Sequence, residues 1–554
     1  MPPASLGHFD AVIVGSGFGG SVMAYRLAKE GRKVLLLERG KPYPPGSFAR
    51  TPQEMQTNFW DPSERLWGLY DFWSFKGIEG LVSSGLGGGS LIYANVLLRK
   101  DRDWFDIDLP DGGKRPWPVS YDDLVDDYEA VEDEIRPSRY PFEATTPKTG
   151  AARRAAEQLP GVDFQLPPIA VAFKSRPDAA PSVGEEIHEE HPNIHGAKRY
   201  TCRLVGECDV GCNSGSKDSL DFTYLSAAER EGARIETLHE VKAFRPRPEG
   251  GYAIDVVHHR PDGDGPLREE LTVTADRLVL SAGTFGSTYL LLRNRKALRA
   301  TPKLLGTGFS GNGDLLMFAL RCVDRDGKDA RLIPTYGPVI TTATRFPDGG
   351  TRETRGFYLQ EAGYPLVGAW MAELASTPAR ASRAAKFGLR LLWEKITRNP
   401  QSNLSGELSE IFGDPSMSYS SIPLLAMGRD FATGKMSLSR RNQLELDWTT
   451  KKSNEYFARV RRDVTRFAEA MGARDVDDSP LWYFKRVITV HPLGGCPMGH
   501  GAEDGVVSAV DGTVFGNPGL HVADGAVLPS SVGANPSLTI AAVSNRFASA
   551  ILDS

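Results

Sequence analysis

The sequence predicts an α/β fold with more than one domain. Residues 10–40 supply the first observation, because an apolar strand at Ala11–Val14, a glycine-rich turn, a helix over Val22–Lys29 and a second buried strand at Val34–Leu37 follow in order. Residues 277–293, RLVLSAGTFGSTYLLLR, supply the second, since they repeat the strand, glycine turn and helix far along the chain. The chain of 554 residues is also too long for one small core, so two or more domains are expected.

The first glycine-rich turn predicts dinucleotide binding. Gly15, Gly17 and Gly20 have the G-x-G-x-x-G spacing, and Glu38 ends the second strand. The glycines allow a tight turn, a close approach to a pyrophosphate and close packing of helix on strand, and the helix N-terminus favours phosphate. The carboxylate favours an unphosphorylated adenosine ribose, as in FAD or NAD, and does not choose between them. The alternative is a βαβ unit with glycine turns and no ligand.

A second glycine-rich stretch lies in residues 82–99, VSSGLGGGSLIYANVLLR. Four glycines before an apolar segment, Gly85, Gly87, Gly88 and Gly89, indicate a backbone that lies against a flat ligand. The alternative is a flexible loop. The segment GTGFSGNGD, residues 306–314, is again dense in glycine.

Composition and charge exclude several classes of protein. A formal net charge of -5 is mild for this length and argues against a general nucleic-acid binder. No apolar run approaches the roughly 18 residues of a transmembrane helix. The first strand begins almost at once and no twin-arginine motif is present, so we expect no signal peptide and a cytoplasmic protein. Five cysteines, an odd number, argue against a disulfide framework.

Residues 379–398 form a basic amphipathic segment with interleaved apolar residues. Such a helix could contact an anionic membrane surface or a partner. The alternative is a surface helix that packs its apolar side on the domain.

Taken together, the motifs resemble the glucose–methanol–choline (GMC) family of flavoprotein oxidoreductases. The N-terminal GSGFGG, then GLGGGS, LSAGTFGS, HPLGGC and the tail VADGAVLPSSVGANPSLTI occur in the family's order and span most of the chain. Within the family, GGGSLIYANV, GSKDSLDFTYLSAA, ETLHEVKAF and the HPLGGC block are most similar to the bacterial cholesterol oxidase branch. The resemblance implies FAD, not NAD, as the cofactor.

The resemblance also implies a domain plan: a discontinuous Rossmann-like FAD domain and a substrate domain built on a mostly antiparallel sheet. The expected FAD domain comprises residues 1–50, 80–100, 200–315 and 486–554. The expected substrate domain and cover segments comprise residues 51–79, 101–199 and 316–485.

Three catalytic residues are implied by the resemblance: His491, its partner Asn535, and Glu361 as an acid or base from the substrate domain. Oxidation of an alcohol removes a hydroxyl proton and a hydride from one carbon, and the cofactor takes the hydride. Histidine suits the proton because its pKa lies near neutrality. An asparagine amide can hold the substrate oxygen without a charge that opposes alkoxide development.

The cofactor contacts implied by the resemblance extend those of the glycine motifs. Asp524 would contact the ribityl or pyrophosphate part, Gly525 would allow close approach, Val241 would lie near the adenine, and Asn95 would contact the flavin. We therefore expect cofactor contacts from Gly15, Gly17, Gly20, Glu38, Gly85, Gly88, Gly89, Ser90, Asn95, Val241, Gly283, Asp524, Gly525 and Asn535.

Three cysteines stand apart from the cholesterol oxidase pattern. Cys202, Cys208 and Cys212 have a C-x5-C-x3-C spacing that resembles the catalytic subunits of certain bacterial FAD-dependent glucose dehydrogenases. That resemblance implies a [3Fe-4S] cluster on the three thiolates, which would pass electrons out of the flavin. The alternatives are buried thiols, or one local disulfide and a free thiol.

The expected function is FAD-dependent oxidation of an alcohol to a ketone or aldehyde on a bulky apolar substrate, with a sterol or steroid as the first choice. The acceptor is oxygen if the cysteines bind no cluster, and a separate carrier if they do. A dehydrogenase of a sugar or another non-steroid alcohol is the first alternative. An NAD-dependent enzyme or a non-enzymatic dinucleotide-binding protein is the second.

Overall fold

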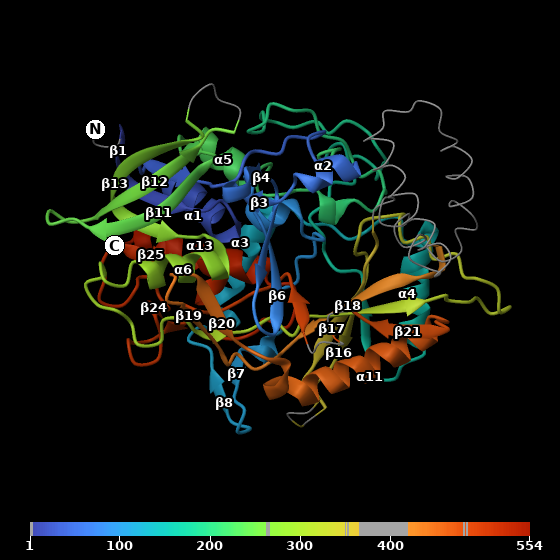
Figure 1. Cartoon of the computed structure of the whole chain (residues 1–554). Helices are drawn as coiled ribbons and strands as arrows, with labels where there is room; N and C mark the ends of the chain where they lie inside the picture. Colours follow the sequence, from blue (N-terminus) through green and yellow to red (C-terminus); the bar gives the residue numbers. More distant parts are fainter. Residues whose placement is uncertain are drawn as a thin grey trace, which may run out of the picture.

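Two sheets dominate the computed structural model, which describes residues 4–261, 266–349, 351, 354–364, 419–479, 482 and 486–554 (Figure 1). The basic segment 379–398 lies outside these described residues. No helix in the described ranges combines the length and the apolar character that a bilayer crossing requires.

The first sheet has seven strands and confirms the predicted Rossmann-like domain. Its order is β10-β2-β1-β13-β12-β11, with β25 beside the end of β13. Strands β1, β2, β10, β13 and β25 pair in parallel, and β11 and β12 continue the sheet antiparallel. The strands are β1 (Ala4–Val14), β2 (Val34–Leu37), β10 (Arg234–Glu236), β11 (His239–Pro246), β12 (Tyr252–His259), β13 (Arg268–Leu280) and β25 (Leu520–Val522).

Helices from both ends of the chain cover this sheet. Helix α1 (Phe18–Lys29) packs against α5 (Tyr224–Arg230) and against α13 (Ser537–Leu552), which in turn packs on α3 (Val125–Ile135). Helix α1 begins four residues before the predicted start at Val22, because two glycines occupy its first turn where other side chains would collide.

The second sheet is antiparallel throughout and confirms the predicted type of substrate domain. Its order is β21-β15-β18-β17-β16-β9. Helices α4 and α11 pack on it and on each other, at the right and lower side of Figure 1. The elements are α4 (Pro147–Glu157), β9 (Asp163–Gln165), β15 (Leu315–Leu320), β16 (Ala343–Phe346), β17 (Phe357–Glu361), β18 (Ile422–Gly428), α11 (Asn454–Ala470) and β21 (Asp475–Asp478).

A small three-stranded sheet joins the aromatic-rich segment to the C-terminal motifs. Strand β22 (Val487–Thr489) pairs in parallel with β6 (Ile78–Ser83), which forms a hairpin with β5 (Tyr70–Ser74). The chain that leaves β22 enters the HPLGGC block directly, so this sheet sets where that block begins.

The remaining elements are short, apart from α6, which follows β13 directly. They are α2 (Pro52–Gln56), β3 (Trp60–Asp61), β4 (Leu66–Trp67), β7 (Asp106–Asp108), β8 (Lys114–Pro116), α6 (Gly283–Arg293), β14 (Thr307–Phe309), β19 (Gly434–Leu438), β20 (Leu444–Asp447), β23 (Met498–Gly499) and β24 (Val507–Ser508). The strands of the first sheet come from the ranges predicted for the FAD domain, but the domain boundaries themselves stay a prediction.

Candidate active site

One cavity of about 720 Å³ is lined by residues of both large sheets. The glycine turn after β1 and the end of β2 line one part of it. Strands β15 and β18 line another, through Leu316 and Leu425. His491 and Asn535 also line this cavity, so the predicted nucleotide site and the predicted catalytic residues share one space.

The turn after β1 has the geometry that its glycine spacing predicts. Gly15 has φ +99°, and a Cβ there would lie 2.3 Å from Ser281 O. A Cβ on Gly20 would lie 2.0 Å from Gly15 O, so this glycine lets the helix pack on the strand. Gly17 differs, because it lines the cavity and a Cβ there would meet nothing within 4 Å. Helix α1 therefore starts beside open space, with no side-chain cap on its N-terminal amides.

The carboxylate of Glu38 is fixed at the end of β2. One oxygen accepts hydrogen bonds from Ser16 N (3.0 Å) and Ser16 Oγ (2.6 Å), and the other from Gly40 N (2.8 Å). Glu38 also lines the cavity, together with Val241 at the start of β11. Both positions fit the predicted contacts with the adenosine part of a dinucleotide.

The second glycine stretch faces the first. Gly88 and Gly89 line the cavity, and a Cβ on Gly88 would lie 2.7 Å from the Cα of Gly17. Gly85 and Ser90 lie behind this wall: a Cβ on Gly85 would meet the Leu91 side chain at 2.8 Å, and Ser90 Oγ accepts from Leu220 N. Only part of the stretch therefore faces the cavity.

Asn95 is fully buried, and its backbone has a φ of +68°. Neither side-chain polar atom has a hydrogen-bond partner within the described part of the chain. Asn95 does not line the cavity, although Ala94 and Val96 do. Its predicted contact with the flavin stays a prediction, and its amide is a buried polar group that lacks a partner.

Asp524 joins the turn after β13 to the turn after β25, beside the first glycine turn. Its Oδ2 accepts from Gly283 N (2.9 Å) and Ser287 Oγ (2.5 Å), and its Oδ1 accepts from Ala526 N (2.8 Å). Burial disfavours the charged form and raises the pKa of this carboxyl to about 6. Gly283, Asp524 and Gly525 all line the cavity. Glycine backbones, an uncapped helix N-terminus and a fixed carboxylate thus surround a space that fits an extended dinucleotide such as FAD.

His491 enters the cavity from the end of β22 and is held by one carboxylate. Its Nδ1 lies 2.9 Å and 3.1 Å from the two oxygens of Asp314, whose side chain is 1 % exposed. Val490 N donates to the same carboxylate, and Thr489 Oγ1 lies 2.9 Å from it. A carboxylate accepts hydrogen bonds, so Nδ1 carries the proton and the lone pair of Nε2 remains for a ligand.

Asn535 lies in the loop before α13, and Gln360 of β17 holds its amide. Gln360 Nε2 donates to Asn535 Oδ1 at 2.7 Å, and both side chains are buried. The bond fixes the carbonyl end of the Asn535 amide against the sheet. Asn535 Nδ2 also donates to Gln360 Oε1, at 3.4 Å, so one of its two N–H groups remains for a ligand oxygen in the cavity.

Glu361 is placed away from this group. In the register of β17 and β18, Gln360 pairs with Leu425 and Glu361 with Leu424. Leu425 lines the cavity and Leu424 does not. Successive side chains on a strand point to opposite faces, so Glu361 faces away from Asn535.

The carboxylate of Glu361 has its own buried partners. Lys148 Nζ of α4 donates to it at 2.9 Å, and both side chains are fully buried. The main-chain amides of Thr341 and Thr342 donate at 3.0 Å each, and their hydroxyls donate as well. The geometry thus gives Glu361 a buried ion pair with Lys148 and no place in the cavity lining, and its predicted role as an acid or base stays a prediction.

The three cysteines predicted to bind an iron–sulfur cluster do not form a metal-binding set. Cys202 and Cys208 are buried, Cys212 is partly exposed, and all three are free thiols. No group of three or more His, Cys, Asp or Glu side chains in the described residues is arranged to hold a metal ion. The described residues therefore give no support to the predicted cluster and show no disulfide between these cysteines, and two of the three thiols are buried.

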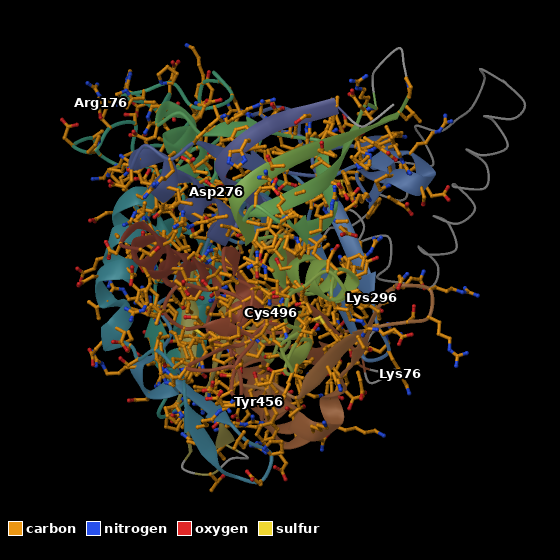
Figure 2. All side chains as sticks on the ribbon, turned by 90° about the vertical axis from the view of Figure 1, so that its left-hand side faces the viewer. Lys76, Arg176, Asp276, Lys296, Tyr456 and Cys496 are labelled. Atoms are coloured by element: carbon orange, nitrogen blue, oxygen red, sulfur yellow. The ribbon has the colours of Figure 1, made fainter. Side chains whose placement is uncertain are left out.

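A lysine stabilises this cysteine-containing loop. Lys217 Nζ is buried and donates to the carbonyls of Leu91 (3.0 Å), Tyr93 (2.9 Å) and Cys208 (2.9 Å). Burial raises the pKa of the Cys208 thiol, and Lys217 acts against this shift. The other two cysteines, Cys322 and Cys496, lie outside this loop and are fully buried, and Cys496 is labelled in Figure 2.

Sequence reasoning missed Asp314 and Gln360, the two residues that hold the predicted catalytic residues His491 and Asn535. Asp314 ends the glycine-dense segment 306–314, which carried no obvious chemistry in the sequence. Gln360 stands one position before the predicted Glu361, on the other face of the strand. The alternation of β17 would have selected Gln360 only if the cavity face had been known.

Two family models match the chain, one described as "GMC oxidoreductase" over residues 431–544 and one as "NAD(P)-binding Rossmann-like domain" over residues 13–50. A cholesterol oxidase of Mycobacterium tuberculosis is 27% identical over 98% of this chain and 90% of its own length. A cholesterol oxidase of Acinetobacter baumannii is 24% identical over 97% of this chain and 93% of its own length.

The solved structures support the fold. A formate oxidase from Aspergillus oryzae superposes with a TM-score of 0.57 at 15% identity, covering 100% of this chain and 99% of the other. The matches at both ends of the chain and along its whole length agree with the two-sheet architecture described above.

Proposed function

Because this chain belongs to the GMC oxidoreductase family and is therefore an FAD-dependent enzyme that acts on a CH–OH group, we propose that it oxidises a bulky apolar alcohol. One observation supports the proposal: His491 and Asn535 line the same cavity as the glycine turns at Gly17 and at Gly88–Gly89. Asp314 holds His491, and Gln360 holds Asn535.

A sterol or steroid is the proposed substrate class. Two observations support it. The second sheet contributes the cross-strand partners Leu316 and Leu425 to the cavity wall, and Val339 and Ile340 add further apolar lining. The relatives named cholesterol oxidase align with almost the whole chain.

His491 would remove the hydroxyl proton of the substrate. Its Nε2 faces the cavity with a lone pair because Asp314 engages Nδ1. The carboxylate also stabilises the imidazolium that forms when Nε2 accepts the proton. Asp314 acts here through His491 and is a positioning residue.

Asn535 would hold the substrate oxygen from the other side. Its NH₂ group can donate a hydrogen bond that strengthens as charge develops on that oxygen. Gly17, Gly88 and Gly89 line the part of the cavity that would hold FAD, and FAD would supply the hydride acceptor there. His491 would take the hydroxyl proton and Asn535 would hold the oxygen while the alcohol is oxidised to a ketone or aldehyde.

Oxygen is the proposed electron acceptor. The described cysteines do not form a metal-binding set, so the observation that favoured a separate carrier no longer does so. The alternative, a dehydrogenase that passes electrons through an iron–sulfur cluster, predicts about three irons per purified chain.

The test is anaerobic reduction of the purified yellow protein by cholesterol, with glucose and a long-chain primary alcohol in parallel. Cholesterol is expected to abolish the visible flavin absorption, and readmitted oxygen is expected to restore it with formation of hydrogen peroxide. Reduction by glucose but not by cholesterol would contradict the substrate class. Iron at about three equivalents, with slow reoxidation by oxygen, would contradict the acceptor.

The variant His491→Ala tests the catalytic assignment. It should reduce kcat by about 10²–10⁴-fold, the usual contribution of a general base, with the flavin still bound. His500→Ala is the matched control, because His500 is exposed and outside the cavity. Undiminished turnover in His491→Ala would remove His491 from the mechanism.

A further inference from the structure

The loop that carries Asn535 has an unusual support. Among the described residues, no main-chain to main-chain hydrogen bond involves residues 531–535. Side chains bind this loop instead. Lys100 Nζ donates to the carbonyls of Ser531 (2.8 Å) and Val532 (3.2 Å).

Asn312 makes most of the remaining contacts. Its Oδ1 accepts from Val532 N at 2.9 Å and Gly533 N at 3.0 Å, and its Nδ2 donates to Ala534 O at 2.9 Å. The three bonds hold one main-chain group in each of the three residues immediately before Asn535. Asn312 is fully buried, so no water replaces these bonds.

Asn312 is itself held rigidly. Its backbone is left-handed, with φ +54°. Its N–H donates to Ser310 Oγ at 2.9 Å, and its carbonyl accepts from Gly428 N at 2.9 Å. The amide plane of Asn312 therefore has a fixed direction relative to the second sheet.

The same short turn holds the catalytic histidine. Asp314, two residues after Asn312, engages His491 Nδ1. Asp430 fixes the base of the turn, because its carboxylate accepts from Ser310 Oγ, Gly311 N and Gly313 N. One turn, residues 310–314, thus determines the positions of both residues that would face the substrate oxygen.

We propose that Asn312 is a positioning residue that sets the place of the Asn535 amide relative to His491. This inference rests on the proposed function, in which both groups meet the substrate oxygen. A displacement of about 1 Å in a reacting geometry typically reduces the rate about 100-fold, and loss of the Asn312 amide frees the loop to move by such an amount.

The test compares Asn312→Gly and Asn312→Asp with the parent holoenzyme. Glycine retains the left-handed backbone and removes all three side-chain bonds, so kcat should fall about 100-fold with unchanged flavin content. Aspartate retains the acceptor and loses the donor to Ala534 O, so a smaller fall of about tenfold is expected. Asn442→Gly is the control, because Asn442 has a similar φ of +57°, its side chain is exposed, and it does not itself line the cavity.

The decisive readout is the same pair of variants in an Asn535→Ala background. If Asn312 affects kcat only by positioning the Asn535 amide, its replacement should have little effect once that amide is absent. In the Asn535→Ala background, Asn312→Gly should therefore lower kcat by less than about threefold. A full 100-fold loss in that background, or no loss in the parent, would overturn the proposal. If Asn312→Gly does not fold, Asn312→Asp alone gives the comparison. One outcome separates this inference from the assignment of His491. If Asn535→Ala leaves kcat unchanged while His491→Ala abolishes turnover, Asn535 does not hold the substrate oxygen and this inference is wrong. The assignment of His491 would then still stand.

Discussion

Two regions of the cavity position a ligand in different ways. We call the glycine turns around Gly15–Gly20 and Gly88–Gly89 the nucleotide cradle, and we call His491, Asn535 and the residues that hold them the proposed catalytic group. The cradle consists mainly of backbone, and its glycines are required because a Cβ at Gly15, Gly19 or Gly20 would lie within 2.3 Å of a carbonyl oxygen. The catalytic group consists of side chains that hold other side chains, as Asp314 holds His491 and Gln360 holds Asn535. Substitutions in the cradle should therefore act by introducing steric collisions. Substitutions in the catalytic group should act by removing hydrogen bonds.

The largest effect is expected in the cradle. Gly19→Ala places a Cβ 1.7 Å from Ala523 O, a main-chain atom that cannot move without β25. The variant should lose soluble, flavin-containing protein, as measured by expression yield and flavin absorption. Gly17→Ala is the matched control: nothing lies within 4 Å of its Cβ, so it should fold and bind FAD more weakly. Equal yields and flavin contents in both variants would show that the contact at Gly19 relaxes.

Glu361→Gln should change stability and leave the chemistry nearly intact. It removes the counter-charge of the fully buried Lys148, and breaking such a pair typically costs about 3–5 kcal/mol. The rate of flavin reduction in the folded variant should stay within about threefold, because Glu361 faces away from Asn535. Glu186→Gln is the control, since its pair with Lys198 is exposed and should contribute little to stability. A 100-fold slower reduction in Glu361→Gln would restore Glu361 as an acid or base.

Asp314→Asn should weaken catalysis without affecting cofactor binding. An amide can present its NH₂ group to Nδ1 and favour the tautomer with the proton on Nε2, which cannot accept the substrate proton. We expect kcat to fall about 100-fold or more, and the pH profile of kcat to change because the imidazolium loses its counter-charge. Flavin content and the thermal midpoint serve as controls. An unchanged pH profile would show that Asp314 is only structural.

Asp430 should make the stability of the catalytic turn depend on pH. Burial is the main cause that raises the pKa of this carboxyl from 3.8 to about 6, and the charge of Asp314 adds to the shift. The hydrogen bonds from Ser310 and Gly311 and the charge of Arg355 lower the pKa and oppose this shift. The folded chain thus holds this proton more tightly than the unfolded chain. Its contribution is complete below about pH 4 and is lost as the pH rises through 6, by at most about 3 kcal/mol.

The measurement is the difference in unfolding free energy between the parent and Asp430→Asn from pH 4 to pH 7. The parent should lose stability relative to Asp430→Asn as the pH rises. Asp111→Asn, at an exposed loop position, should give a constant difference. A pH-independent difference for Asp430→Asn would mean that the carboxyl ionises as easily in the folded chain as in the unfolded one.

The smallest effect concerns the thiols. Burial raises the pKa of the thiols of Cys202, Cys208 and Cys496, and a thiol that stays protonated reacts slowly. Native protein should therefore react rapidly at about one thiol, Cys212, and all five should react after unfolding. Cys212→Ser should remove the rapid phase. Three rapid equivalents would indicate that the loop of residues 202–212 opens in solution.

The same contrast explains how much the sequence could predict. The cradle could be predicted because short segments of consecutive residues form it, so that the spacing of Gly15, Gly17 and Gly20 contains its geometry. His491 and Asn535 were accessible through motifs of the family. Their supports were not, because Asp314 lies 177 residues from His491 and Gln360 lies 175 residues from Asn535. Glu361 was selected from local pattern alone, and only the strand register shows that its neighbour faces the cavity.

The close contact between α1 and α13 has a consequence for the order in which the chain is made. The ribosome makes the first βαβ unit well before β25 and α13, which complete its sheet and cover its helix and lie within residues 520–552. The face of α1 that packs on α13 therefore stays uncovered in the nascent chain until residue 552 has been made. A premature stop anywhere before residue 520 would leave the first βαβ unit without both of these elements.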